Sequence, residues 1–177
     1  MSDITIERIG HVALVEIRRP PNNFFDIALI QDIAAAFESF DQEADIRAIV
    51  LASRGKAFCA GHDLKEMQAG RQAEDGGRAY FADLFTRCGE VMQLIPTLPQ
   101  PVIARPHGIA TAAGCQLVAS CDLAVAVDSA TFCTPGVNIG LFCSTPMVAI
   151  SRTIGRKQVM EMLLTGDAID AETALAW

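Results

Sequence analysis

Positive charge is scarce in this sequence. Of its 177 residues, 14 are Lys or Arg and 21 are Asp or Glu, which gives a formal net charge of -7. Only three of the basic residues are lysines, and the basic residues form no cluster along the chain. A general nucleic-acid binder carries a basic stripe or patch. The charge pattern excludes this class, and we expect no nucleic-acid partner.

Metal-ligand and redox motifs are also absent. The sequence has no Cys-x-x-Cys pair, and its three histidines, His11, His62 and His107, show no metal-ligand spacing. Residues 1–4 are too polar and too acidic for a secretory signal or a transit peptide. Most of the six cysteines lie in apolar runs, where a reduced, buried thiol is commoner than a disulfide. We expect no metal site and a reducing, cytosolic compartment.

No stretch of the sequence reads as a membrane helix. The longest run without a formal charge, 129–151, is long enough to span a bilayer, which takes about 20 residues. Proline, glycine and asparagine interrupt it, so we expect a strand, a loop and a helix start packed in a core, and no membrane partner. The chain is 51% hydrophobic and 20% charged, which excludes wholesale disorder. At about 100–200 residues per domain, residues 1–177 form one domain.

Hydrophobic periodicity predicts strands that alternate with helices. A β-hairpin is expected over 4–9 and 12–17, and Asp26 is expected to cap a helix with an apolar stripe from Ile27 to Phe40. A continuous apolar run at 46–52 is typical of a buried parallel strand. This alternation indicates an α/β domain. The further elements predicted are a small helix after Asp63, a helix at 74–95, strands at 101–104, 123–127 and 131–133, and a helix at 146–165.

Two segments are poor in packing side chains and rich in backbone. Residues 58–64 and 108–116 each follow a strand and open a helix. Small residues let a ligand approach the main chain, and the free N–H groups of a helix start stabilise negative charge. The alternative is that small residues merely let a helix pack closely on a sheet, because a single glycine-rich turn is weak evidence for a site.

These segments resemble a known family, the enoyl-CoA hydratase/isomerase (crotonase) superfamily. Residues 56–67 look like its first oxyanion loop and 101–122 like its second, and Thr165-Gly166-Asp167 matches the next landmark. The resemblance covers essentially the whole chain. It implies the crotonase (ClpP/crotonase-like) ββα spiral fold. Within the family, one subgroup is most similar at 110–116, 134–136 and 141–146.

The resemblance also implies a ligand and a mode of binding. Members of the family stabilise a thioester enolate with two backbone N–H groups, which are here the amides of His62 and Ala113. Each donor of this kind is worth about 2.7–4 kcal/mol in the transition state. Coenzyme A then enters as part of the substrate, an acyl-CoA small molecule, with no separate cofactor. A homo-oligomer, a trimer or a hexamer, is implied as well.

The first loop carries the further substrate-binding residues implied by the resemblance. The carbonyl of Ala60 matches the one that holds the adenine of coenzyme A, and Lys56 and Lys65 flank the loop where its phosphates would lie. For each lysine, a solvated surface charge is an equally good interpretation. Asp63 and Leu64 belong to the same loop, and Asp63 also suits the N-terminus of the following helix.

The sequence departs from the family at both acid–base positions. Hydratases of the family have glutamates where this chain has Gln116 and Gly136, and each lost acid–base group costs about 10²–10⁴-fold in rate. The acids between Pro106 and Gly166 offer no substitute by position. We expect Asp122 to cap or pair, and Asp128 and Glu161 to lie in a turn and on a polar helix face.

Three functional hypotheses therefore remain open. The first is an enoyl- or acyl-CoA enzyme whose hydratase activity is doubtful, and the second is a non-catalytic acyl-CoA sensor or buffer. The third is a thioesterase in which the His62 side chain or Cys143 takes part, although a thiol in an apolar run is usually inert. Members of the family also continue beyond the position of Trp177. Because 171–177 is amphipathic with no helix stop signal, we expect the C-terminal helical part to be absent from this chain.

Overall fold

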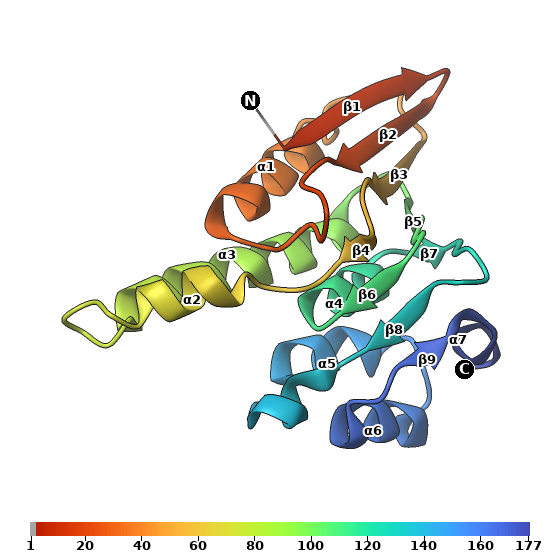
Figure 1. Ribbon diagram of the computed structural model, residues 1–177. Helices are drawn as coiled ribbons and strands as arrows, with labels where there is room; N and C mark the ends of the chain where they lie inside the picture. Colours follow the sequence, from red (N-terminus) through yellow and green to blue (C-terminus); the bar gives the residue numbers. More distant parts are fainter. Residues whose placement is uncertain (1–2) are drawn as a thin grey trace.

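The computed structural model describes residues 3–177 and contains two sheets (Figure 1). The five-stranded sheet has the order β1-β2-β3-β5-β7, and the four-stranded sheet has the order β4-β6-β8-β9. Strand β1 pairs antiparallel with β2 and β9 antiparallel with β8, and the other pairs are parallel. The first sheet comprises β1 (Ile4–Ile9), β2 (Val12–Ile17), β3 (Ala48–Ser53), β5 (Val102–Ala104) and β7 (Leu123–Ala124), and the second β4 (Ala57–Cys59), β6 (Ile109–Thr111), β8 (Thr131–Cys133) and β9 (Ile169–Asp170).

The chain passes from the larger to the smaller sheet three times. Each passage (β3 to β4, β5 to β6, β7 to β8) is followed by helical structure, so that the repeating unit is strand, strand, helix. This is the expected ββα spiral, and the α/β class is confirmed. The helices are α1 (Ile27–Glu38), α2 (Leu64–Gly70), α3 (Arg78–Leu94), α4 (Ala113–Ser120), α5 (Ser144–Ile150), α6 (Arg156–Thr165) and α7 (Ala171–Ala176), with 3-10 turns at Ile95–Thr97 and Pro135–Ile139.

Several predicted boundaries are wrong for local reasons. The helix expected at 74–95 begins only at Arg78, because Gly76 and Gly77 take positive φ values of 68° and 86°. The strand expected at 123–127 pairs only over its first two residues. The helix expected at 146–165 starts at Ser144 and is broken into α5 and α6, with extended Gly155 as the N-cap of α6.

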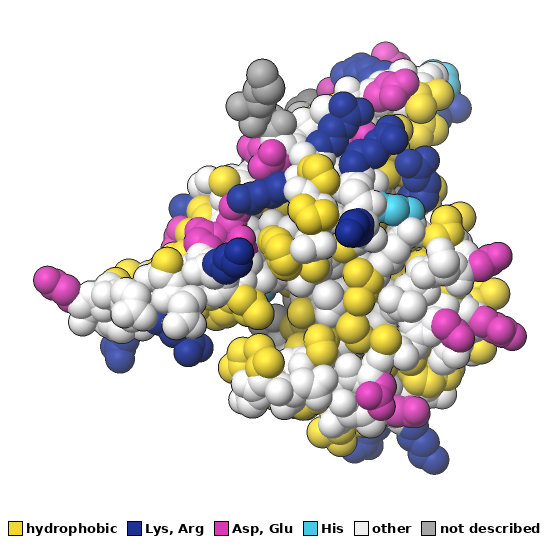
Figure 2. Space-filling model, in the orientation of Figure 1, with side chains coloured by type: hydrophobic (Ala, Val, Ile, Leu, Met, Phe, Trp, Pro, Cys, Tyr) yellow, Lys and Arg dark blue, Asp and Glu magenta, His cyan; other side chains and the backbone are white. Residues whose placement is uncertain are grey.

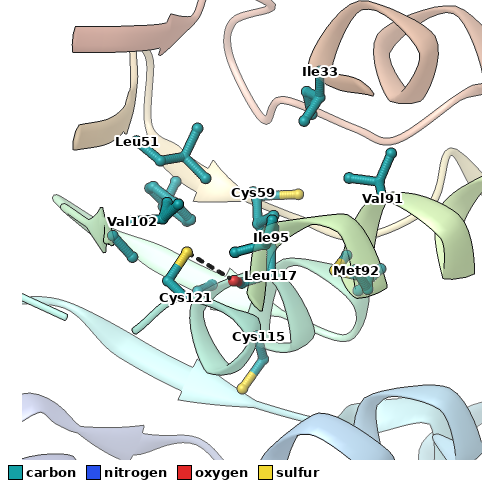
Figure 3. Close-up of a cluster of buried hydrophobic side chains, with 14 of the residues drawn as sticks. Ile33, Leu51, Cys59, Val91, Met92, Ile95, Val102, Cys115, Leu117 and Cys121 are labelled. Carbon is teal, nitrogen blue, oxygen red and sulfur yellow. Dashed lines mark hydrogen bonds between the residues drawn. The ribbon is translucent and has the colours of Figure 1, made fainter. Parts of the chain in front are cut away.

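Side chains from β3, β5, α3 and α4 meet in one buried cluster (Figure 3). Leu117, at the centre of α4, is fully buried, as are Leu51 and Ile95. The thiol of Cys121 donates to the carbonyl of Leu117 over 3.3 Å. All six cysteines are free and buried, as expected for a reduced chain. The cluster fixes α4 against the larger sheet, and α4 begins at the second candidate loop.

A buried carboxylate ties together the carboxyl ends of β2 and β3. The side chain of Glu16 is 3% exposed and pairs with Arg54 Nε at 2.7 Å and Arg18 Nε at 2.8 Å. Burial raises the pKa of Glu16, but the hydrogen bonds and charges of Arg54 and Arg18 outweigh burial and lower the pKa below its ordinary value of 4.5. Because the folded-state pKa is the lower one, the ion pairs stabilise the fold at neutral pH and their contribution disappears as the pH falls through it.

We predict that Glu16→Gln lowers the free energy of unfolding at pH 7 by about 1–2 kcal/mol, since both arginines are partly exposed and the charges are screened. The deficit should shrink as the pH falls below about 4. Urea denaturation at several pH values measures both effects. Glu7→Gln, at an exposed position of the neighbouring β1, serves as the control. A deficit of equal size at pH 3 and pH 7 would contradict the account.

Candidate functional site

The first loop is held open by hydrogen bonds on both sides of His62. Phe25 N donates to Gly61 O over 2.8 Å, and Asp63 N donates to Phe25 O over 2.9 Å. Gly61 takes a φ of 81°, in the left-handed region that favours glycine. The amide of His62, between these two bonds, donates none of the hydrogen bonds found within residues 3–177. The loop therefore presents one free N–H.

A buried asparagine that the sequence analysis missed anchors this loop. Asn23 is fully buried, and its Nδ2 donates to the carbonyl oxygens of Arg54 and Ala57, each over 2.8 Å, and of Phe58 over 3.2 Å. Its backbone takes a φ of 51°, which asparagine tolerates better than most residues. The Pro-Pro-Asn-Asn turn at 20–23 was the available signal. We had taken it only as the end of the hairpin.

The second loop turns sharply into α4 at Ala112. Ala112 has φ 51° and ψ -118°, an uncommon conformation for a residue with a side chain that costs about 1–3 kcal/mol. Its N–H donates to Cys133 O and its carbonyl accepts from Gln116 N, both over 3.0 Å. Ala113 is the first residue of α4, where the N–H has no intrahelical partner. Within the described part of the chain, this amide is not a hydrogen-bond donor either.

The two loops touch at their glycines. A Cβ built on Gly61 would lie 3.0 Å from Ala112 Cβ and 3.5 Å from Ala113 N. A Cβ built on Gly114 would lie only 2.1 Å from Cys59 O. The small residues therefore do allow close packing of α4 on β4, as the alternative interpretation held. The same packing places the free amide of Ala113 beside the first loop.

We predict that Gly114→Ala destabilises the protein by about 1–3 kcal/mol or more, because its methyl group would overlap the carbonyl of Cys59. Gly89→Ala is the matched control, since a Cβ there would meet nothing closer than 3.9 Å on the surface of α3. This change should stabilise by about 0.5–1 kcal/mol. Thermal unfolding followed by circular dichroism compares the two. Equal stability of Gly114→Ala and wild type would show that the loops are further apart.

The ring of His62 is enclosed by aromatic side chains. Its centroid is 6.3 Å from that of Phe25 and 5.5 Å from that of Phe85, both edge to face. Burial lowers the pKa of the imidazole to about 4, so that the ring is neutral at physiological pH. The buried Nε2 has no hydrogen-bond partner within residues 3–177.

Cys143 lies apart from His62. Its side chain is 8% exposed, and burial raises the pKa of the thiol despite a hydrogen bond with the backbone of Gly136. No hydrogen bond or ring contact joins Cys143 to His62 in the described part of the chain. The thiol is therefore protonated at neutral pH and has no adjacent base.

The positions of the two replaced glutamates differ in character. Gln116 is 5% exposed on the first turn of α4, and its Oε1 is buried without a hydrogen-bond partner among residues 3–177. At Gly136 there is no room for a side chain, because a Cβ would lie 2.7 Å from Leu141 O and 2.8 Å from Cys143 Sγ. A glutamate at 136 would require this loop to move.

The other candidate residues divide between surface and structure. Asp63 is the N-cap of α2, and its Oδ1 accepts from the amides of Lys65 and Glu66. Ala60 is half-buried, and exposed positions are taken by Leu64, Lys56 and Lys65. Asp122, as expected, pairs locally, because its Oδ2 accepts from Val102 N over 2.7 Å.

The face that carries the loops is hollowed between the α2–α3 pair and α5, and hydrophobic side chains lie at both rims (Figure 2). Lys and Arg side chains gather on the same face over the β1–β2 hairpin. Within residues 3–177, no group of three or more His, Cys, Asp or Glu side chains is placed to hold a metal ion. None of the helices in that range is both long and apolar enough to cross a membrane.

Comparison with known proteins identifies the family. The family model described as "Enoyl-CoA hydratase/isomerase" matches residues 7–177. The chain belongs to the enoyl-CoA hydratase/isomerase family. The subgroup indicated by the sequence is supported too: the enoyl-CoA hydratase domain-containing protein 3 of Mus musculus is 45% identical over 94% of this chain and 53% of its own length.

Solved structures of this enoyl-CoA hydratase/isomerase family have the same fold. An enoyl-CoA hydratase of Mycobacterium smegmatis superposes with a TM-score of 0.92 at 49% identity, over 98% of this chain and 66% of that one. The human enoyl-CoA hydratase domain-containing protein 3 gives 0.91 at 42% identity, over 98% and 67%. The crotonase fold is confirmed. The chain spans about half the length of the curated relatives it matches best.

The expected cytosolic compartment is wrong. Relatives from mouse, rat, human and Xenopus laevis, at 44–46% identity, are all named as mitochondrial proteins. Reduced, buried cysteines indicate a reducing environment, but they do not distinguish the cytosol from other reducing compartments. The inference failed at that step.

Proposed function

We propose that this protein binds an acyl- or enoyl-CoA thioester and holds its carbonyl oxygen on the amides of His62 and Ala113. The observation that carries the proposal is the contact of the two loops, each with a free N–H beside Gly61. Two fixed N–H groups stabilise negative charge on an oxygen without reorganising. Membership of the enoyl-CoA hydratase/isomerase family supports a thioester as the carrier of that oxygen.

Coenzyme A enters as part of the substrate in this proposal, with no further cofactor. The carbonyl of Ala60 takes the adenine, Asp63 and Leu64 complete the loop, and the exposed Lys56 and Lys65 meet the phosphates. Residues 1–177 act as the acyl-CoA-binding core domain. Several large apolar side chains are well exposed, among them Leu123 at 59%, Val125 at 63% and Leu175 at 89%. Such surface is typical of subunit interfaces and supports a homo-oligomer, a trimer or a hexamer.

The reaction is less well supported than the ligand. A hydratase needs a group that activates water, and Gln116 is neutral while Gly136 has no space for a side chain. These two positions favour a second candidate, a non-catalytic acyl-CoA-binding protein. A thioesterase is the weakest of the three candidates, because the neutral His62 ring and the protonated Cys143 thiol do not contact each other.

Calorimetric titration with butyryl-CoA and free CoA, together with loss of enoyl absorbance from crotonyl-CoA, tests the proposal. We predict that the thioester binds more tightly than free CoA and that hydration is at least about 10²-fold slower than in a member with both glutamates. Binding with no turnover would favour the second candidate. Equal affinity for CoA and its thioester would refute the role of the amides.

Ala113→Pro tests one donor directly. Proline lacks the N–H and is tolerated at the first position of a helix, so we predict that affinity for butyryl-CoA falls about 2–10-fold while affinity for free CoA is retained. Arg156→Pro, at the exposed first position of α6, controls for the effect of proline on a helix start. Unchanged thioester affinity in a folded Ala113→Pro variant would exclude this amide.

A further inference from the structure

Gln116 is a buried polar group that the local structure leaves unsatisfied. It is 5% exposed, and its Oε1 has no hydrogen-bond partner in residues 3–177. A buried acceptor without a partner destabilises a fold, and native proteins seldom retain one without a reason. The side chain cannot act as a general base, so that reason lies elsewhere.

The position of Gln116 in α4 directs it toward the same stretch of α3 as His62. Ser120 lies one turn further along that face of α4, and its Oγ contacts Met92 Sδ of α3 over 3.6 Å. The ring of His62 contacts Phe85, two turns before Met92 on α3. Phe85 is 42% exposed. Gln116 and His62 thus lie against one side of α3, at a point that solvent reaches.

Gln116 is also one turn beyond the amide proposed to hold the thioester oxygen. A helical turn rises about 5.4 Å, which places this side chain beside the carbons that follow the thioester carbonyl rather than beside the carbonyl itself. An acceptor oxygen in that place needs an O–H donor. A saturated or enoyl chain carries none there.

We infer that Gln116 selects acyl groups that bear a hydroxyl on the second or third carbon, whose O–H donates to Gln116 Oε1. The inference rests on the proposed function and adds the class of acyl group. The same acceptor would also suit a bound water, and the two sources of the O–H differ in a measurable way. A ligand hydroxyl makes binding depend on the acyl group, whereas a water leaves hydroxylated and plain chains alike.

Calorimetric titration with butyryl-CoA, 2-hydroxybutyryl-CoA and 3-hydroxybutyryl-CoA separates these possibilities. For the wild-type chain, one hydroxylated thioester should bind on the order of 10-fold more tightly than butyryl-CoA. In Gln116→Met, which keeps the length and loses the amide, this ratio should fall to about 1. Because the change removes an unpaired buried acceptor, its melting temperature should be no lower than that of the wild type.

Gln100→Met is the matched control. Gln100 is 6% exposed, and its Nε2 donates to Phe40 O over 2.9 Å, away from both loops. This variant should lose stability and keep the wild-type preference. Equal affinity of the wild type for all three thioesters, or a preference retained in Gln116→Met, would overturn the inference and leave the proposed function standing. If no thioester binds, the proposed function fails and the inference fails with it.

Discussion

The first turn of α4 packs against the end of β4 so closely that no side chain fits between them. Gly114 meets the carbonyl of Cys59, and Gly61 meets Ala112 and the amide of Ala113. The buried cluster around Leu117 presses α4 against the larger sheet from behind, and Asn23 holds the first loop from the other side. Core packing is thereby converted into the fixed placement of two backbone N–H groups, and the strained conformation of Ala112 is retained because its surroundings leave no alternative.

Around these amides the structure offers polarity without charge. The His62 ring is neutral because burial lowers its pKa to about 4, Gln116 is an amide, and Gly136 has no space for a carboxylate. In such surroundings, charge that develops on a bound oxygen is stabilised mainly by the two N–H dipoles. The features that make acid–base catalysis weak therefore leave the binding of a thioester intact, and this is why the ligand is better supported than the reaction.

Much of this arrangement could be predicted from the sequence. Alternating apolar residues located the hairpin and α1, and the two glycine-containing segments located both loops. The second sheet was not apparent, because β4, β6 and β9 have two or three residues each and so short a strand shows no periodicity. The role of Asn23, the lack of space at Gly136 and the unpaired Oε1 of Gln116 depend on tertiary contacts. No local pattern encodes such contacts, so these features required the structure.

The central claim is that the amides of His62 and Ala113 polarise a thioester carbonyl. Isotope-edited infrared spectroscopy of butyryl-CoA labelled with carbon-13 at that carbonyl measures this most directly. Hydrogen bonds from two fixed donors weaken the C=O bond, so the account predicts a lower stretching frequency for the bound thioester than for the thioester free in water. A frequency equal to or higher than that of the free ligand, in a sample where binding is complete, would contradict it.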